Sequence, residues 1–234
     1  MGHGMPKHEW IRSQLLAEVA GLPTDTRLPD ERELTERFGV SRATVRQALA
    51  ALVNEQKIYS IRGHGTFVAG EPISRGLRLR SFSEDMRERG LEPSTRLLLA
   101  EEVDAAAEVA ARLELAPGTT VVHLERLRLA DGFPMCLETI WLPTSLFPRL
   151  LTEDLHQSLY SILSNRYQVD IDSADEKIES AIMDRRTREL LSMPNPSSAL
   201  IVIRRSFDKK GRAVEYGRSA YRADRYSFDV SIKR

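Results

Sequence analysis

Apolar residues near the start of the chain recur at the spacing of a helix. Ile11, Leu15 and Val19 lie four positions apart, which places them on one face of an amphipathic helix over residues 8–20. Gly21 follows directly and is expected to end it.

A second helix is expected to begin after Asp30. The Asp30 carboxylate can accept from exposed backbone N–H groups at a helix start, and Glu33 lies three positions further on, as in a capping box. Leu34 and Phe38 form the apolar face of this helix.

A short turn at Gly39 and Val40 separates the second helix from a third. Ser41 is suited to cap the third helix, and its inward stripe consists of Val45, Leu49, Leu52 and Val53. Two helices joined by so short a turn indicate a helix-turn-helix, a pattern that is only moderately specific for DNA binding.

Residues 58–68 contain two β-prone runs around a glycine-rich tip, which predicts a hairpin. The whole chain has 34 basic and 34 acidic residues and no net charge, so nucleic-acid binding requires a local patch. Residues 41–62 supply one, with four basic side chains against Glu55. Solvated arginines on an ordinary surface are the alternative explanation. A hairpin tip of Arg62, Gly63 and His64, small and cationic enough to enter a groove, favours DNA binding.

Three blocks resemble the winged helix-turn-helix of GntR-type bacterial transcription regulators over residues 8–69: Leu28–Leu34 (LPDEREL), Phe38–Leu49 (FGVSRATVRQAL) and Gly63–Val68 (GHGTFV). The chain departs from the family at Asp30, where Ser is usual, and at residues 55–57, where Glu-Gln-Lys replaces Glu-Gly-Leu.

The resemblance implies contacts to operator DNA, with arginines serving phosphates and guanine edges. Arg46 is the first candidate for base readout. Gln47, beside it on the third helix, and His64, at the hairpin tip, complete the predicted set: Arg32, Arg42, Thr44, Arg46, Gln47, Arg62, Gly63 and His64.

The rest of the chain alternates strand-like and helical patterns, which predicts a mixed α/β (α+β) fold. Helical periodicity at residues 103–115, 155–163 and 185–191 is expected to cover one side of the sheet. Strand candidates are residues 95–103, 119–130, 134–142, 199–208 and 213–222.

The predicted organisation has three parts. Pro72 and Gly76 lie in a stretch without apolar periodicity, which indicates a connector. The expected parts are a winged helix-turn-helix domain at 6–70, a linker at 71–79 and an effector-binding and dimerisation domain at 80–234.

Two arginines extend an apolar row on one predicted strand. Within residues 119–130, side-chain alternation puts Arg126 and Arg128 on the face of Val122 and Leu124. Partly buried guanidinium groups need an anion, and their planar fork suits phosphate. An internal ion pair with Glu125 or Glu138, or exposure at a sheet edge, explains them equally well.

Other strands add polar groups to this picture. Glu215, Gly217, Ser219 and Tyr221 share one face, which leaves room for a bound molecule, although close packing over Gly217 is the commoner explanation. Glu138 lies among apolar neighbours. Together these side chains describe a pocket for an anionic, hydroxyl-rich ligand such as a phosphosugar.

Residues 80–231 resemble the UTRA effector domain of the HutC branch of GntR regulators, whose antiparallel sheet with helices is similar to chorismate lyase. Within that branch the likeness is greatest to amino-sugar regulators of the NagR and DasR type, which respond to phosphorylated glucosamine or N-acetylglucosamine. The similar segments are Ser81–Met86 with Gly90, Glu125–Arg128, Pro134 with Glu138 and Thr139, Ser158–Tyr160, Glu215 with Tyr216, and Tyr221–Tyr226.

This resemblance implies a role for each matching position. Phe82 and Ser83 of a loop, Arg126, Arg128 and Ser158 would hold the phosphate. Glu138, Tyr160, Glu215 and Tyr221 would line the sugar. Ala223 replaces a frequent Gly, which is expected to alter a turn more than the pocket.

The sequence therefore predicts a ligand-responsive transcription repressor that binds double-stranded operator DNA as a homodimer. Cys136 is the single cysteine, and no Cys/His spacing resembles a zinc site, so no internal disulfide, metal or cofactor is expected, and a cytoplasmic location is predicted. No apolar stretch is long enough to suggest a membrane span. An enzyme with a lyase-like domain is an alternative, which the attached DNA reader disfavours. A DNA binder without an effector, or with a different one, is another.

Overall fold

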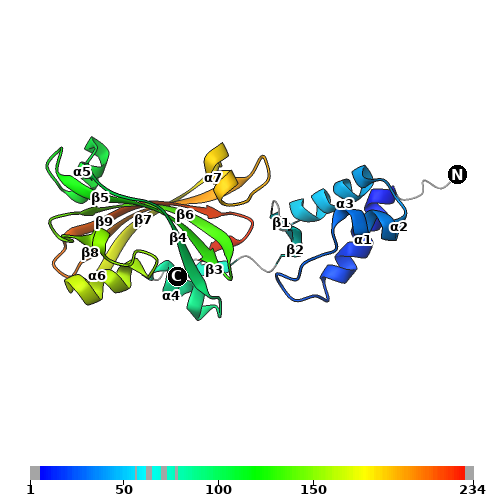
Figure 1. Cartoon of the computed structure of the whole chain (residues 1–234), viewed down its shortest axis with the longest axis horizontal. Helices are drawn as coiled ribbons and strands as arrows, with labels where there is room; N and C mark the ends of the chain where they lie inside the picture. Colours follow the sequence, from blue (N-terminus) through cyan, green and yellow to red (C-terminus); the bar gives the residue numbers. More distant parts are fainter. Residues whose placement is uncertain (1–5, 56, 62–64, 70–72, 77–78, 230–234) are drawn as a thin grey trace, which may run out of the picture. The chain divides into compact units, whose positions relative to one another are not determined.

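The computed structural model describes residues 6–55, 57–61, 65–69, 73–76 and 79–229 (Figure 1). The chain divides into two compact units: the first holds the residues up to Pro72, and the second holds nearly all of those from Ile73 onward. None of the described helices is long and apolar enough to cross a membrane.

The first unit has the elements that its sequence predicts. They are α1 (Lys7–Val19), α2 (Glu31–Phe38), α3 (Arg42–Asn54), β1 (Ile58–Ile61) and β2 (Gly65–Val68). The two strands form an antiparallel hairpin. The predicted stripes form one core, in which Ile11, Leu15, Leu34, Val45 and Leu52 are fully buried.

Local capping fixes the helix-turn-helix. The Asp30 carboxylate accepts from the backbone N–H groups of Arg32 and Glu33 at 2.8 and 2.9 Å, and the Glu33 carboxylate accepts from the Asp30 N–H at 2.7 Å. Gly39 ends α2 with a φ of 62°, a conformation that glycine adopts without strain. Ser41 caps α3 through the N–H of Thr44. The predicted capping box is therefore confirmed.

Replacing Asp30 by alanine is expected to lower the free energy of unfolding of the first unit by about 1 kcal/mol, because an orphan helix N–H group loses its acceptor. Asp30→Asn retains a capping oxygen and should lose much less. Urea unfolding followed through Trp10 fluorescence, in a Trp141→Phe background, measures both. Equal losses in the two variants would contradict the capping role.

A six-stranded antiparallel sheet dominates the second unit, in the order β4-β5-β6-β9-β8-β7. Five strands correspond to predicted ones. The sixth, β7, was not predicted, because its charged, mostly exposed residues show no clear apolar alternation. The strands are β4 (Pro93–Asp104), β5 (Thr120–Ala130), β6 (Phe133–Pro143), β7 (Ile171–Ile182), β8 (Ser198–Asp208) and β9 (Ala213–Arg222).

The predicted linker contains a strand. β3 (Ile73–Gly76) pairs in parallel with β10 (Tyr226–Asp229), so this part of the chain is not an irregular connector. The hydrogen-bonding partner comes from the far end of the sequence, where the local pattern gives no sign of it. Residues 71, 72, 77 and 78 lie outside the described residues, and the exact domain boundaries stay a prediction.

Helices cover both faces of the large sheet, which corrects the expectation that they lie on one side. α6 buries Leu159 and Leu163 in the same cluster as Val122, whereas α5 buries Leu113 with Val121. Adjacent strand residues point to opposite faces. Figure 1 shows α4 and α6 on one side and α5 and α7 on the other. The helices are α4 (Phe82–Glu88), α5 (Ala107–Leu113), α6 (Leu159–Tyr167) and α7 (Arg185–Leu190), with a 3₁₀ turn at Leu150–Thr152.

Candidate functional site

Of the predicted DNA-contacting side chains, those that the structure describes lie at the surface of the first unit. Arg42 and Arg46 are exposed one turn apart on α3, Gln47 is exposed beside them, and Thr44 is half-buried. Arg32 is exposed on α2. Arg62, Gly63 and His64 lie outside the described residues. The assignment of this surface to DNA stays a prediction.

Two of these arginines have acidic partners at the surface. Arg46 Nε lies 2.8 Å from a carboxylate oxygen of Glu31, and Arg32 Nε lies 3.1 Å from Glu36. Exposed ion pairs of this kind contribute only about 0–1 kcal/mol. Either arginine can therefore exchange its carboxylate for a phosphate or a base edge at small cost.

A polar site occupies the sheet face that α6 covers. The register places Arg126 of β5 directly opposite Glu138 of β6, and Glu138 opposite Ser219 of β9. Gly217 of β9 lies opposite Arg204 of β8. Alternation within each strand brings Glu215 and Tyr221 to the same face.

Arg126 and Arg128 are both almost completely buried, at 2% exposure. Arg126 Nη2 lies 2.6 Å from Glu138 Oε2, while Arg128 Nη1 is 3.6 Å from the same oxygen. Glu125, on the other face, pairs with Arg186 instead. Of the explanations left open by the sequence, the Glu138 ion pair is thus present, but one carboxylate faces two guanidinium groups.

Arg128 is held by two residues at the start of α4. Its Nη2 donates to Ser83 Oγ at 2.8 Å, and its guanidinium carbon lies 4.8 Å from the centre of the Phe82 ring. Burial lowers the pKa of Arg128, with the Glu138 carboxylate acting in the opposite direction. These two contacts hold the side chain in place, although its charge is poorly solvated.

Several guanidinium N–H groups of this pair have no acceptor in the described part of the chain. They are Nε and Nη1 of Arg126 and Nε of Arg128, all buried. A buried donor without an acceptor costs about 1–3 kcal/mol, and more when it is charged. An anion in the adjacent cavity would remove this cost.

A second group of hydrogen bonds lies beside the arginines. Tyr160 Oη and Ser206 Oγ donate to Glu215 Oε2 at 2.9 and 2.8 Å, and Arg204 Nη1 donates to Tyr160 Oη at 2.9 Å. Arg204 also pairs with Glu176 of β7. Burial raises the pKa of the Glu215 carboxyl and raises that of Tyr160 well above its usual value. Tyr160 is therefore a neutral donor.

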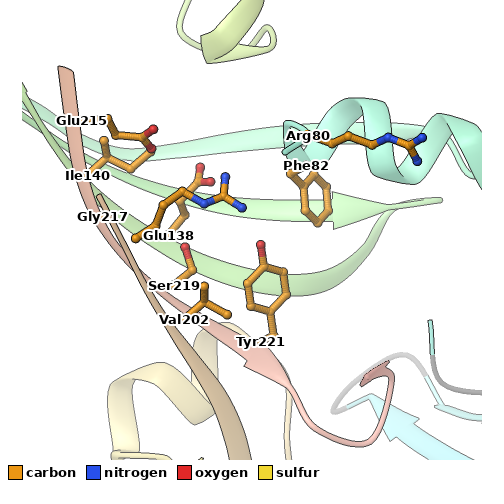
Figure 2. Close-up of a pocket in the computed structure, with 10 residues that line it drawn as sticks. Arg80, Phe82, Glu138, Ile140, Val202, Glu215, Gly217, Ser219 and Tyr221 are labelled. Atoms are coloured by element: carbon orange, nitrogen blue, oxygen red, sulfur yellow. The ribbon is translucent and has the colours of Figure 1, made fainter. Parts of the chain in front are cut away.

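Two adjoining cavities open onto these groups. Both are lined by Phe82, Glu138, Arg204 and Glu215. The first adds Arg126, Arg128, Ser158 and Tyr160. The second, drawn in Figure 2, adds Ser219 and Tyr221, whose hydroxyl points towards the Phe82 ring, and Arg80, whose guanidinium extends along α4.

The structure brings the predicted effector residues together. Ser83 lines neither cavity but binds Arg128. Eight of the nine line one cavity or the other: Phe82, Arg126, Arg128, Glu138, Ser158, Tyr160, Glu215 and Tyr221. Their roles in ligand binding stay a prediction.

Phe82 and Ser83 are not in a loop, as was expected, but in the first turn of α4. Ser81 caps this helix in a capping box with Glu84. The Ser-x-x-Glu spacing at 81–84 was a usable signal. The family resemblance alone implied a loop at these positions.

Arg204 was missed by the sequence analysis. It shares a strand face with Val202 and Ser206, so alternation along residues 199–208 would have placed it on the face of the pocket. Only the register, which puts Arg204 opposite Gly217, shows that its guanidinium has room to reach Tyr160.

Comparison with known proteins identifies both units. The family model of the bacterial regulatory proteins of the gntR family matches residues 8–68, and that of the UTRA domain matches residues 88–227. The chain belongs to the GntR family and carries a UTRA domain.

Individual GntR relatives match over almost the whole chain. The repressor NagR of Bacillus subtilis is 34% identical, with 96% of this chain and 93% of NagR covered. The mannosyl-D-glycerate transport/metabolism system repressor MngR of Escherichia coli is 32% identical, and the match covers 100% of this chain and 98% of MngR. The crystal structure of PhnF from Mycobacterium smegmatis matches with a TM-score of 0.68 at 31% identity. The match covers 95% of this chain and 99% of the PhnF chain.

These relatives place this GntR protein in the HutC branch. It is a ligand-responsive transcription regulator and not an enzyme, which confirms the predicted class. The mixed α/β fold with an antiparallel effector sheet is confirmed by the likeness to PhnF.

Proposed function

We propose that the protein is a cytoplasmic repressor, bound to its operator as a homodimer and released when a phosphorylated amino sugar enters the UTRA pocket. Glucosamine-6-phosphate and N-acetylglucosamine-6-phosphate are the proposed ligands. One observation carries the proposal: Arg126 and Arg128 are buried at a cavity, and three of their guanidinium nitrogens have no acceptor in the described part of the chain.

The arginine end of the pocket suits a phosphate. Arg126 and Arg128 offer charge-assisted donors, and the buried hydroxyl of Ser158 lies at the start of α6, where the helix N-terminus favours negative charge. Glu138 neutralises only one of the two guanidinium charges. One negative charge on a ligand would therefore balance the charge that remains.

The opposite end suits hydroxyl or amino groups. Glu215 retains acceptor capacity beyond its bonds from Tyr160 and Ser206. Glu138 and Ser219 face the same space (Figure 2). The similarity to NagR supports an amino sugar. Arg126 and Arg128 line only the first cavity and Ser219 lines only the second, so the pocket offers different groups to the two ends of such a ligand.

Release from DNA requires the ligand to prefer one arrangement of the protein. A tenfold fall in operator affinity needs about 1.4 kcal/mol of differential binding. Charge-assisted hydrogen bonds contribute about 1.5–3 kcal/mol each. A few bonds made fully in only one arrangement would be sufficient.

A thermal-shift panel tests the proposal. Both amino-sugar 6-phosphates should raise the melting temperature, by an amount that corresponds to about 2.7 kcal/mol when the ligand is at a hundred times its Kd. Glucosamine without phosphate should have little effect, because the arginine end gains nothing from it. The change in melting temperature with inorganic phosphate alone measures binding at the arginine end without the sugar.

The same ligands should release operator DNA in a fluorescence anisotropy assay. Equal stabilisation by phosphorylated and unphosphorylated sugars would refute a phosphate site at Arg126 and Arg128. Stabilisation without release of DNA would refute the proposed repressor mechanism but not the binding site.

A further inference from the structure

β7 forms one edge of the large sheet and is unusually open. It follows β8 regularly from Ser173 to Ile182, and its one irregularity lies at its start. Ile178 is 38% exposed and Ile182 is 76% exposed. They account for two of the five exposed large hydrophobic side chains among the described residues. An edge strand also presents a row of backbone N–H and C=O groups that can pair with another strand.

We propose that β7 pairs antiparallel with β7 of a second copy of this chain, around a two-fold axis at Ile178. The two six-stranded sheets would then form one continuous sheet. This inference rests on the homodimer of the proposed function and deepens it, because it assigns the surface and the register of the contact.

The sequence of β7 is complementary to itself in this register. Each residue lies opposite the one at the same distance on the other side of position 178, so Ile178 meets Ile178 and Ile182 meets Ala174. On the other sheet face, Lys177 meets Glu179, and the symmetry repeats that pair. Opposite charges at directly paired positions stabilise antiparallel strands. Within one copy, Lys177 and Glu179 are already close enough to form an ion pair.

Neighbouring registers are unfavourable. An axis at position 177 would oppose two lysines and set Asp175 against Glu179, and an axis at position 179 would oppose two glutamates. Directly paired residues must share a sheet face, so an axis midway between residues is excluded. The axis at Ile178 instead gives apolar pairs and Lys177–Glu179 pairs, sets Glu176 against Ser180 and Asp175 against Ala181, and opposes no like charges between residues 174 and 182.

The other edge of the sheet is less suited to pairing. β4 has a register irregularity between Leu97 and Leu99, in the middle of the strand, and such bulges interrupt edge pairing. None of the exposed large hydrophobic side chains among the described residues belongs to β4. The apolar exposure and the regular backbone thus coincide only on β7.

A charge exchange tests this interface. Sedimentation equilibrium of the full chain should show that Lys177→Glu and Glu179→Lys each raise the dimer dissociation constant by about tenfold, because two favourable pairs become two repulsive ones. The double variant restores opposite charges and should return to within about twofold of the parent. Arg166→Glu on α6, which removes an ion pair with Glu153, is the matched control and should leave the dimer dissociation constant unchanged.

Ile182→Asp provides an independent arm, since a largely exposed side chain can be replaced without unfolding the protein. It should weaken the dimer by at least about tenfold. A dimer that none of the β7 variants weakens would overturn this interface and leave the proposed function standing. A double variant as weak as the single ones would overturn the register. A chain that is monomeric throughout would overturn both the interface and the proposed homodimer.

Discussion

Replacing Arg126 by alanine is expected to raise the Kd for the 6-phosphate ligand by at least about a hundredfold. Arg126 is almost fully buried, so water cannot replace the hydrogen bonds that its guanidinium group would donate to the phosphate. Two charge-assisted bonds at about 1.5–3 kcal/mol each account for that loss. The change also leaves the charge of Glu138 less compensated beside the incoming anion. Titration calorimetry measures the Kd, and anisotropy of labelled operator measures the loss of ligand response.

Two further variants separate the effect of the charge of Arg126 from that of its planar guanidinium shape and from a general disturbance of the fold. Arg126→Lys keeps the charge but loses the planar fork, and an intermediate loss is expected. Arg186→Ala removes a guanidinium that pairs with Glu125, the neighbour of Arg126 on the opposite face of β5, and ligand binding should be unchanged. A folded Arg126→Ala protein that binds the phosphosugar as the parent does would refute the phosphate site.

The first unit could be predicted from sequence because its signals are local. Helix periodicity, the capping box at Asp30 and the left-handed turn at Gly39 all lie within a few residues of the elements they specify. β3 and β7 could not be predicted in the same way. β3 is held by pairing with β10, more than a hundred residues away. β7 is an edge strand with little to bury, so the alternation that marks a half-buried strand is weak.

The pocket was predictable in part for the same reason. Strand alternation alone puts Arg126 with Arg128, and Glu215 with Tyr221, on shared faces. Whether Arg126 meets Glu125 or Glu138 depends on strand register, and the structure sets Glu138 directly opposite. A chain of polar contacts joins α6 to three strands: it runs from Glu215 of β9 through Tyr160 of α6 and Arg204 of β8 to Glu176 of β7. No local pattern contains that information.

Replacing Arg46 by alanine is expected to weaken operator binding by about 1–3 kcal/mol, or about fivefold to 150-fold. The side chain is 70% exposed, so its loss should leave the fold intact. Its bond to Glu31 is a surface ion pair that contributes little to stability. The guanidinium can therefore leave that carboxylate for a guanine edge, to which its planar fork can donate two hydrogen bonds. Anisotropy with an operator selected from random DNA measures the effect at one fixed salt concentration.

Arg37→Ala is the matched control for Arg46→Ala. Arg37 is also exposed and paired with a carboxylate, Glu18, but it lies at the end of α2 and outside the predicted DNA surface. Loss of operator affinity with unchanged binding to random DNA identifies a base contact, because phosphate contacts act on all sequences alike. An equal loss on both DNAs would reassign Arg46 to the phosphate backbone. Undiminished discrimination between them would remove Arg46 from the predicted interface.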